Sequence, residues 1–367
     1  MLILIFASLF FVTSVVFYVP VKPSSTNFSQ SSKRVAQHPT SLLRYLPQSY
    51  VRDGSVDYTR YIQQLIDENR NITIPGFPIL INDGGIKIKS GRTIEFEKGS
   101  VLLLKPSRKT KYSMLHLENI TNVRLIAPVL SGDRFSHLGS EGEWGMGIGI
   151  YSCSNITIID PKIRNCWGDG IYLGRTNYVN KNIRIINAHL TFNRRDGISV
   201  ISVNGLNLED CYSGYNNGTL PMTGINFEPN SSKDEIDNVV VTNPVTEHNG
   251  SNGIQFTLGR LLSSIGKKYI NIKVINHKDR NSGRFPFKFT VSRRPHEPGE
   301  ISGSVDIVRP NWRNYGEKPI YFSLSEGNVK VSLFSPILAE NDGKHLSPDI
   351  TRSRLKKSVR MGQLIIN

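Results

Sequence analysis

The chain has 367 residues, long enough for one large domain or two of ordinary size. Its 38% hydrophobic and 9% aromatic residues are typical of a globular protein and exclude an intrinsically disordered chain. Its 45 Lys and Arg residues outnumber 30 Asp and Glu, giving a formal net charge of +15. A basic surface of this kind favours a polyanionic partner, such as nucleic acid, an anionic membrane surface or an acidic polysaccharide. A generally basic surface without a specific partner explains the charge equally well.

Residues 1–19 (MLILIFASLFFVTSVVFYV) carry no charged side chain. Their length fits either a membrane-spanning helix or the apolar part of a secretory signal. We therefore expect residues 1–21 to be a signal peptide or a membrane anchor, with anchoring through residues 1–19 in the second case. Both alternatives predict export, so we expect a secreted or cell-envelope protein. Residues 22–48 are rich in Ser, Thr, Pro and Gln and are interpreted as a linker.

An amphipathic pattern over residues 57–69 predicts a helix, with Asp57 as its N-cap. Short strand-like runs follow it, beginning with Ile72-Thr-Ile. A helix placed before the first repeat would cover the open end of a stacked structure, as the terminal caps of solenoids do.

A repeat of 23 to 29 residues dominates the next part of the chain. Its first signal is a Gly-Ile pair, which recurs at Gly147, Gly170, Gly197, Gly224 and Gly253. Its second signal is a short strand opened by asparagine, at Asn122, Asn155, Asn182, Asn238 and Asn271. Such repeats bury their apolar faces only by stacking, and short strands without helical periodicity favour a parallel β-helix. The sequence therefore predicts an all-β fold with one parallel β-helix domain over residues 49–340.

The alternation of the strands after each Gly-Ile pair separates an inner from an outer face. The predicted inward residues are Ile171, Leu173, Ile198, Val200, Ile225, Phe227, Ile254 and Phe256. The predicted outward column is Tyr172, Ser199, Asn226 and Gln255, extended by Lys288 and Tyr321, with Glu228 two places further along. Flat rings and hydrogen-bonding groups of this kind suit a sugar site. The alternative is that any solvent-exposed sheet face is polar.

A turn beside this column contains Asp169 and Asp196, which are 27 residues apart, the length of one repeat. If the two carboxylates stack, their repulsion raises one pKa, which suits acid–base chemistry. Arg194 and Arg195 next to them could bind a uronate carboxylate. The alternative is that an Asp before Gly simply forms the turn.

A long excursion over residues 132–146 precedes the first Gly-Ile pair, and we expect it to overhang the outward column. Long loops on a regular scaffold often carry function. Within it His137 is a candidate general acid or base, and the candidate substrate-binding residues are Asp133, Arg134, Glu143 and Trp144. No spacing predicts a tight metal site and no cofactor is required. A calcium ion bridging Asp169, Asp196 or Glu228 to a uronate would be compatible with the sequence.

The three cysteines, Cys153, Cys166 and Cys211, are too few for a disulfide framework. We expect buried thiols, with one pair (Cys153–Cys166 or Cys166–Cys211) as the alternative. After residue 340 the repeat fades, and the stretch from Arg352 to Arg360 is basic without apolar periodicity. Residues 341–367 are therefore predicted to be a solvated basic tail.

The run DYTRYIQQLIDENRNITIPGFPILINDGGIKI and the repeats from Val123 to about residue 340 resemble the pectin-lyase-like superfamily. This resemblance implies a right-handed parallel β-helix. The superfamily includes pectate and alginate lyases, polygalacturonase-like hydrolases, uronate epimerases and phage tailspikes. The Gly-His-Gly and Arg-Ile-Lys signatures of polygalacturonases and the Asp-Pro-His-Asp run of alginate epimerases are absent from this sequence. The resemblance therefore implies the fold and leaves the reaction open.

The sequence thus predicts an exported enzyme that cleaves a polysaccharide, most consistently an acidic one, by lyase or glycoside hydrolase chemistry. The predicted catalytic residues are Asp169, Asp196, His137 and Glu228. The predicted substrate-binding residues include Tyr172, Arg195, Asn226, Gln255 and Lys288. A uronate epimerase and a non-catalytic glycan-binding envelope or adhesin module are the alternatives. Nucleic acid is excluded as a partner because export removes it and no nucleic-acid motif is present.

Overall fold

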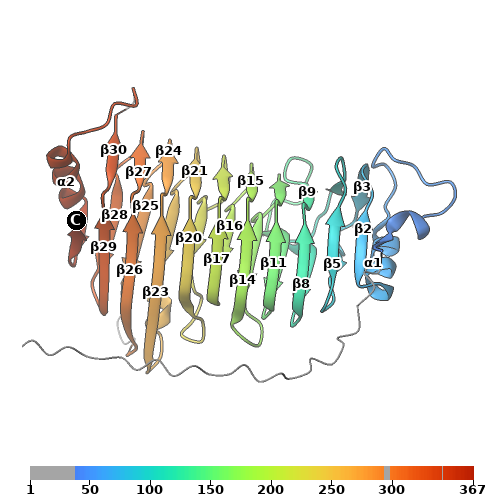
Figure 1. Cartoon of the computed structure of the whole chain (residues 1–367), viewed down its shortest axis with the longest axis horizontal. Helices are drawn as coiled ribbons and strands as arrows, with labels where there is room; N and C mark the ends of the chain where they lie inside the picture. The colour runs from blue at the N-terminus through green and yellow to red at the C-terminus, as the bar shows by residue number, and fades with distance from the viewer. Residues whose placement is uncertain (1–37, 293–297, 341) are drawn as a thin grey trace, which may run out of the picture. The chain divides into compact units, whose positions relative to one another are not determined.

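The computed structural model describes residues 38–292, 298–340 and 342–367. These residues form a solenoid in which every coil contributes one strand to each of three parallel sheets, called here sheets A, B and C (Figure 1). In a complete coil the chain passes from sheet A to sheet B to sheet C and then returns to sheet A. The predicted signal or anchor (residues 1–21) and the first part of the predicted linker (residues 22–37) lie outside the described residues.

Sheet A consists of β1 (Thr40–Ser41), β2 (Asn71–Ile74), β5 (Thr93–Phe96), β8 (Thr121–Ile126), β11 (Ser154–Ile159), β14 (Asn180–Ile186), β17 (Val203–Glu209), β20 (Ile236–Thr242), β23 (Lys267–Ile275), β26 (Glu300–Val308), β29 (Asn328–Phe334) and β32 (Leu364–Ile366). Sheet B consists of β3 (Pro78–Ile81), β6 (Val101–Leu104), β9 (Val129–Ser131), β12 (Lys162–Arg164), β15 (His189–Thr191), β18 (Tyr212–Gly214), β21 (Val245–Glu247), β24 (Lys278–Arg280), β27 (Asn311–Arg313) and β30 (Ile337–Ala339). Sheet C consists of β4 (Ile86–Lys87), β7 (Lys111–Glu118), β10 (Trp144–Tyr151), β13 (Ile171–Gly174), β16 (Ile198–Val200), β19 (Ile225–Phe227), β22 (Ile254–Thr257), β25 (Phe287–Val291), β28 (Ile320–Leu324) and β31 (Val359–Met361).

The core is a stack of apolar side chains, one layer per coil, because strand alternation turns every second residue inward. All eight residues predicted to point inward on sheet C are fully buried, which confirms the predicted phase of these strands. Larger rings fill the later coils: Phe227 stacks on Phe256 with ring centroids 4.3 Å apart. Cys153, Cys166 and Cys211 are buried and free, so the predicted buried thiols are present and neither alternative pair forms.

Asparagine ladders connect successive coils at the turn that leads into sheet A. Asn155 donates to the side-chain oxygen of Asn122, and Asn182 donates to that of Asn155, each over 3.1 Å. All three have positive φ values between 53° and 59°, a conformation that asparagine tolerates better than most residues. The repeated asparagines therefore have a structural role in these coils, because they join one coil to the next.

The N-terminal end is covered by α1 (Thr59–Glu68), close to the predicted helix over 57–69. The N-cap is Tyr58 and not the predicted Asp57, which lies one residue earlier and whose Oδ1 accepts the Thr59 amide over 2.9 Å. The last part of the predicted linker is not a linker. Its strand β1 joins sheet A, and the 3₁₀ helix η1 (Leu42–Arg44) follows, in which Leu42 is fully buried. A second 3₁₀ helix, η2 (Gly259–Leu262), follows β22.

The prediction of a solvated tail over residues 341–367 is wrong. This segment forms α2 (Pro348–Lys357), and then β31 and β32 extend sheets C and A. Ser347 caps α2 by accepting the Ile350 amide, and Leu355 is fully buried in the core. A terminal helix needs only one buried face to pack on the solenoid, and α2 buries only Thr351 and Leu355. A search for apolar repeats therefore does not detect it. Neither helix among the described residues has the length and apolar character of a membrane-crossing segment.

Candidate functional site

The outward column predicted on sheet C is confirmed by the strand register. Tyr172 pairs with Ser199, Ser199 with Asn226, and Asn226 with Gln255. The same register continues to Lys288 and then to Tyr321. These side chains therefore form one line across the strands, parallel to the axis of the solenoid.

Hydrogen bonds join the middle of this column into one network. Lys288 Nζ donates to Gln255 Oε1 over 3.3 Å, and Gln255 Nε2 donates to Asn226 Oδ1 over 3.1 Å. Asn226 Nδ2 in turn donates to Glu228 Oε2 and to Asp196 Oδ2, both over 3.1 Å. Asn226 and Gln255 are themselves buried, with 1% and 4% exposed, so the prediction that they bind a substrate directly is wrong. Their hydrogen bonds instead hold the partly exposed Glu228 and Lys288 in place.

Asp169 and Asp196 stack in adjacent coils, as predicted from their spacing. Asp169 Oδ1 accepts the amide of Asp196 over 3.0 Å, and Asp196 Oδ1 accepts the amide of Thr223 over 2.7 Å. One oxygen of each carboxyl group thus has the structural role that the turn interpretation proposed. The second oxygen of Asp196 accepts from Ser199 Oγ over 2.9 Å, whereas Asp169 Oδ2 is buried and has no hydrogen-bond partner among the described residues.

Both carboxyl groups are fully buried, and this burial raises the pKa of Asp169 and of Asp196. The charge of Asp169 raises the pKa of Asp196 further, while Arg195 opposes the rise in both. Neither side chain can touch a ligand in this arrangement because neither has exposed surface. The prediction that they exchange protons directly with a substrate is therefore replaced by an indirect role, through Arg195.

Arg195 links the buried pair to the surface. Its Nη1 lies 3.8 Å from Asp169 Oδ2, and its Nε lies 3.6 Å from Glu143 Oε2. Burial lowers the pKa of Arg195, but the charges of Asp169, Asp196, Glu143 and Glu228 together raise it above its usual range. One arginine therefore lies in the field of four carboxyl groups. We call Glu143, Asp169, Asp196 and Glu228 around Arg195 the acidic centre.

The excursion over residues 132–146 lies on the same side of the solenoid as Asp169. Its last part delivers Glu143 to Arg195, and Arg194 Nη1 donates to the carbonyl of Gly142 over 2.7 Å. Glu143 keeps 33% of its side chain exposed, and Trp144, 43% exposed, begins β10 next to it. The loop is thus attached to the turn that holds the acidic centre.

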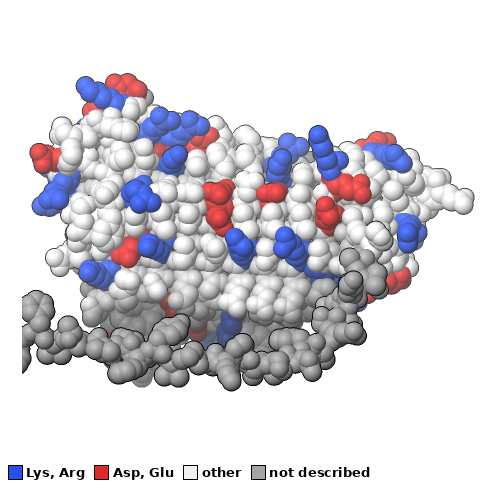
Figure 2. All heavy atoms as spheres, in the orientation of Figure 1, with Lys and Arg blue, Asp and Glu red and all other residues white. Residues whose placement is uncertain are grey.

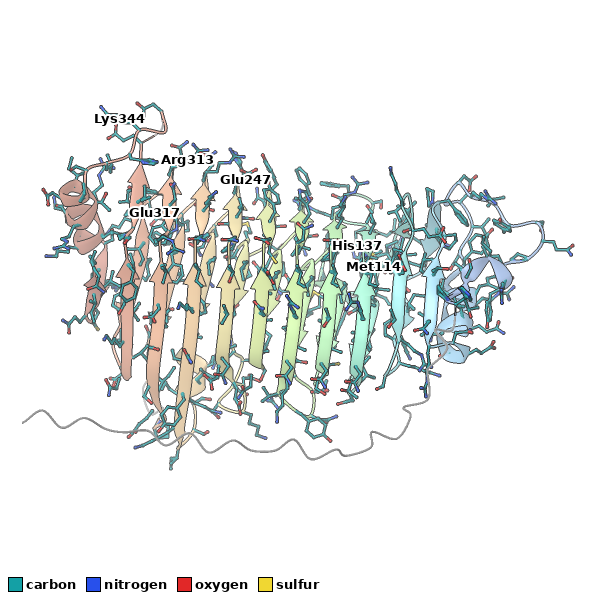
Figure 3. All side chains as sticks on the ribbon, viewed as in Figure 1. Met114, His137, Glu247, Arg313, Glu317 and Lys344 are labelled. Carbon is teal, nitrogen blue, oxygen red and sulfur yellow. The ribbon has the colours of Figure 1, made fainter. Side chains whose placement is uncertain are left out.

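The other predicted residues of this loop anchor it and do not join the acidic centre. Asp133 Oδ2 accepts the Ser107 amide over 2.9 Å and contacts His137 Nδ1 at 2.7 Å, while Tyr112 donates to its other oxygen. The His137 side chain, which is labelled in Figure 3, has no exposed surface. Its ring stacks on that of Trp167 with centroids 4.0 Å apart. His137 therefore has no path to a ligand in this structure.

Arg134 is also an anchor. Its guanidinium donates to the carbonyls of Phe192 and Asn193 over 2.6 and 3.0 Å, and to the carbonyl of Asn217. Backbone carbonyls of two successive coils thus occupy the donors that we expected to bind a substrate.

An aromatic strip, which the sequence analysis missed, precedes the acidic centre on sheet C. His116 lies 5.2 Å from the ring of Tyr151, and Tyr151 lies 5.6 Å from Tyr172. His116 pairs with Gly149 in the same register that leads to Tyr172. Extending the outward phase two coils earlier, through Leu115-His116-Leu117, would have found its first ring.

The described residues contain no group of three or more His, Cys, Asp or Glu side chains arranged to hold a metal ion. The acidic centre has four carboxyl groups, but Arg195 is placed among them and already neutralises part of their charge. Bridging calcium at Asp169, Asp196 or Glu228 stays a prediction that needs a bound substrate to supply further oxygens.

The family described as "Right handed beta helix region" matches residues 135–267. An uncharacterized protein of Bacillus subtilis (strain 168), YclG, is 27% identical over 210 residues, which are 48% of this chain and 36% of that protein. The chain thus matches about a third of the length of this relative.

Solved structures of two carbohydrate-active proteins share the fold. The A-module of the mannuronan C-5 epimerase AlgE4 from Azotobacter vinelandii superposes with a TM-score of 0.60 at 13% identity, covering 89% of this chain and 95% of the module. The endo-xylogalacturonan hydrolase from Aspergillus tubingensis superposes with a TM-score of 0.57 at 12% identity, covering 80% of this chain and 92% of the hydrolase. At these identities the likeness concerns the fold alone. The chain has the right-handed parallel β-helix fold of pectin-lyase-like proteins.

Proposed function

We propose that this chain is an exported enzyme that acts on an acidic polysaccharide bound along the outer face of sheet C. The observation that carries the proposal is the acidic centre: one arginine among four carboxyl groups, beside a hydrogen-bonded polar column. The epimerase and hydrolase that share the fold act on sugar polymers, as their names state, and this supports a carbohydrate substrate.

The face offers three kinds of group in a row along the solenoid. The aromatic strip, ending at Tyr172, provides flat surfaces on which sugar rings stack. The acidic centre follows it, and the polar column then continues through Asn226 and Gln255 to Lys288. A polymer lying parallel to the axis would contact Tyr172, the exposed parts of the acidic centre and Lys288, with the buried amides of Asn226 and Gln255 beneath it.

The accessible groups of the acidic centre are the proposed catalytic residues. Glu228 and Glu143 are both partly exposed and flank Arg195, so they can exchange protons with a bound sugar. Arg195 is proposed to bind a uronate carboxylate, since a guanidinium pairs with a carboxylate through two parallel hydrogen bonds. Asp169 and Asp196 are proposed as positioning residues that hold Arg195 from below.

Lyase and hydrolase chemistry place different demands on these groups. In a lyase, one glutamate would accept the C5 proton of a uronate while Arg195 stabilises the resulting enolate. The C4–O4 glycosidic bond would then break as a C4=C5 double bond forms, and the departing oxygen would take a proton from the other glutamate. A hydrolase needs one carboxylic acid and one carboxylate on opposite sides of the glycosidic bond, which Glu143 and Glu228 could supply. We retain an epimerase, which would return the C5 proton from the other side, and a non-catalytic glycan-binding module as the alternatives.

The test is to incubate the purified full chain with a panel of uronate-containing polysaccharides and matched neutral ones. Products that absorb in the ultraviolet, as the conjugated double bond of an unsaturated uronate does, would identify a lyase. New reducing ends without that absorbance would identify a hydrolase, and an altered C5 configuration without cleavage would identify an epimerase.

Glu228→Gln is expected to lower turnover by about a hundredfold or more, because it removes a proton-transfer group. It preserves the acceptor for Asn226, so the fold should be maintained. Glu95→Gln on sheet A removes the same charge from an exposed site far from the column and serves as the control. A glycan that binds but stays chemically unchanged would favour the non-catalytic alternative.

Secretion, which residues 1–21 predict, is tested separately by fractionating cells and sequencing the N-terminus of the exported chain.

A further inference from the structure

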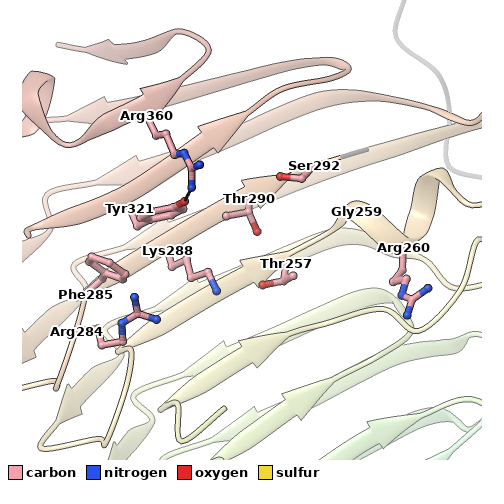
Figure 4. A pocket seen from close by; sticks show the side chains of 10 residues that line it. All are labelled: Thr257, Gly259, Arg260, Arg284, Phe285, Lys288, Thr290, Ser292, Tyr321 and Arg360. Carbon is pink, nitrogen blue, oxygen red and sulfur yellow. Dashed lines mark hydrogen bonds between the residues drawn. The ribbon is translucent and has the colours of Figure 1, made fainter. Parts of the chain in front are cut away.

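A pocket of about 510 Å³ lies on sheet C beyond the acidic centre, toward the C-terminus (Figure 4). Its floor is made by β22, β25 and β28, through Thr257, Lys288, Thr290 and Tyr321. Its volume is in the range of sites for small ligands. Through Lys288, which bonds Gln255, it is continuous with the polar column.

Four cationic side chains line this pocket: Arg260, Arg284, Lys288 and Arg360. Among the residues that the structure describes, no acidic side chain lines it, although the chain as a whole carries 30. In the part of the chain that the structure describes, only Arg284 of the four forms an ion pair, with Glu317 over 2.6 Å. On the face of sheet A shown in Figure 2, by contrast, basic side chains are interspersed with acidic ones. Positive charge is therefore concentrated at the pocket.

Two of the cations are oriented by neighbouring side chains. Arg284 Nε donates to Glu317 Oε1, and its guanidinium lies 5.1 Å from the ring centroid of Phe285. Arg360 Nη1 donates to Tyr321 Oη over 2.8 Å, as the dashed line in Figure 4 marks. Each guanidinium keeps further N–H groups that these bonds do not use. Lys288 and Arg284 point toward the same open space in Figure 4.

Arg360 reaches the pocket because of an irregularity in the last strand pair of sheet C. Phe322 pairs with Val359, and the next residue, Ser323, pairs with Met361. Arg360 is therefore the extra residue of a β-bulge, and such bulges redirect a side chain. The C-terminal segment thus caps the solenoid and also supplies a charge to the pocket.

We infer that this pocket is a binding subsite for an oxyanion group of the polymer, a carboxylate or a sulfate or phosphate ester carried by one sugar unit. The inference rests on the proposed function and deepens it, since it assigns a second, anion-specific contact point to the same face. Arginine forks match the geometry of oxyanions, and half-buried Lys288 adds a fourth positive charge. Phe285 and Tyr321, whose ring centroids are 5.2 Å apart, offer an apolar edge for the sugar that carries the anion.

Burial chiefly, and the charge of Arg284 in addition, lowers the pKa of Lys288, while Glu228 opposes this. A bound anion would stabilise the protonated ammonium and reverse the shift.

The test measures binding of three oligosaccharide probes of equal length to the full chain by titration calorimetry. The probes are an oligogalacturonate, a sulfated carrageenan fragment and a neutral maltooligosaccharide. Arg284→Gln and Arg260→Gln remove pocket charges from two different segments, and Arg360→Gln removes the one at the bulge. Arg124→Gln, on the exposed side of β8 in sheet A, is the matched control.

We expect each pocket variant to weaken binding of the preferred acidic probe by about tenfold, with Arg124→Gln unchanged, because each pocket arginine donates charge-assisted hydrogen bonds to the bound anion and Arg124 does not. The preferred probe distinguishes a carboxylate from a sulfate subsite. Unchanged affinity in both Arg284→Gln and Arg260→Gln, at wild-type melting temperature, would overturn the inference, as would equal affinity for the neutral probe. Because binding is measured without turnover, these outcomes are independent of whether Glu228→Gln abolishes catalysis. Loss of turnover in Glu228→Gln with unchanged pocket variants would leave the proposed function intact and reject the subsite.

Discussion

Buried carboxyl groups occur in two contrasting surroundings in this solenoid. Asp169 and Asp196 lie beneath Arg195 at the edge of sheet C, next to the exposed Glu143 and Glu228. Asp279 lies in β24 of sheet B and points into the core, where it accepts hydrogen bonds from Thr246 and Ser282, both over 2.6 Å. Burial raises the pKa of all three groups, and that of Asp279 reaches about 7.

The neighbours of the two sets differ in one respect that decides their use. Asp169 and Asp196 lie beside Arg195, which also contacts the partly exposed Glu143. Among the described residues, by contrast, the carboxyl group of Asp279 forms hydrogen bonds only with buried ones. Trp312 donates to His277 Nδ1 over 3.1 Å, which leaves the proton of a neutral imidazole on Nε2, 2.7 Å from Thr246 Oγ1. Thr246 then donates to Asp279. A raised pKa therefore marks burial in both places, and only contact with accessible groups marks a candidate site.

The largest effect should separate the two sets by activity. The double variant Asp169→Asn/Asp196→Asn is expected to lower kcat/KM by about a hundredfold, because a displacement of Arg195 by about 1 Å is enough to misplace the substrate. Its pH–rate profile should also shift, which a purely structural role would not cause. Asp279→Asn should stay within about twofold of wild type. Equal losses in both variants would remove the distinction between the two regions.

A further buried carboxyl group, that of Asp133, extends the comparison to the loop. Asp133→Ala leaves the Tyr112 hydroxyl, the Ser107 amide and His137 Nδ1 without their partner. We expect a loss of about 1–3 kcal/mol in the free energy of unfolding, measured by denaturant titration. Activity should also fall, since the same loop carries Glu143 to Arg195. Unchanged stability would mean that the loop is not held by this anchor.

The hydrogen-bonded chain of Trp312, His277, Thr246 and Asp279, called here the core chain, should contribute opposing pH trends to the free energy of unfolding. The pKa of Asp279 is raised by burial from 3.8 to about 7, so its stabilising contribution is full below pH 3.8 and is lost as the pH rises toward 7. The pKa of His277 is lowered by burial from 6.5 to about 3, so its contribution is full above pH 6.5 and is lost as the pH falls toward 3. Between about pH 4 and 6.5 the two trends oppose each other.

Replacing one member should therefore expose the trend of the other. Asp279→Asn is expected to make the melting temperature rise more steeply from pH 4 to 6.5 than it does in wild type, and His277→Gln to make it fall. Melting curves recorded across this range test both variants together. Parallel profiles for wild type and both variants would show that the two groups do not titrate with folding.

The smallest effect concerns salt. Raising the ionic strength from about 0.05 to 0.5 M should increase KM for an acidic substrate several-fold and leave kcat nearly unchanged, because exposed charges are screened over roughly 8 Å already at physiological salt. Asp279→Asn should show the same response, since the core chain makes no contact with the substrate. An unaltered KM would speak against electrostatic binding on sheet C.

The repeat was predictable from sequence because each coil has to bury the same apolar positions. The Gly-Ile pairs and the asparagine-opened strands lead directly to the phase of sheet C, and thus to the line from Tyr172 to Tyr321. The spacing of Asp169 and Asp196 likewise predicts their stacking, since one repeat separates them. Local periodicity is enough for all of this, because contacts in a solenoid join only neighbouring coils.

Other features depended on where segments without a repeat finally pack. The sequence does not reveal that His137 is sealed against Trp167 or that Arg134 bonds three backbone carbonyls, because an irregular loop has no period from which to read its direction. It also does not reveal that the basic C-terminal stretch closes the solenoid and that a bulge places Arg360 over Tyr321. The sequence by itself determined the coil, its core and its outward column. Only the tertiary structure decided which charged groups meet on that column and which are exposed, because burial and contact between distant segments arise from packing and not from local pattern.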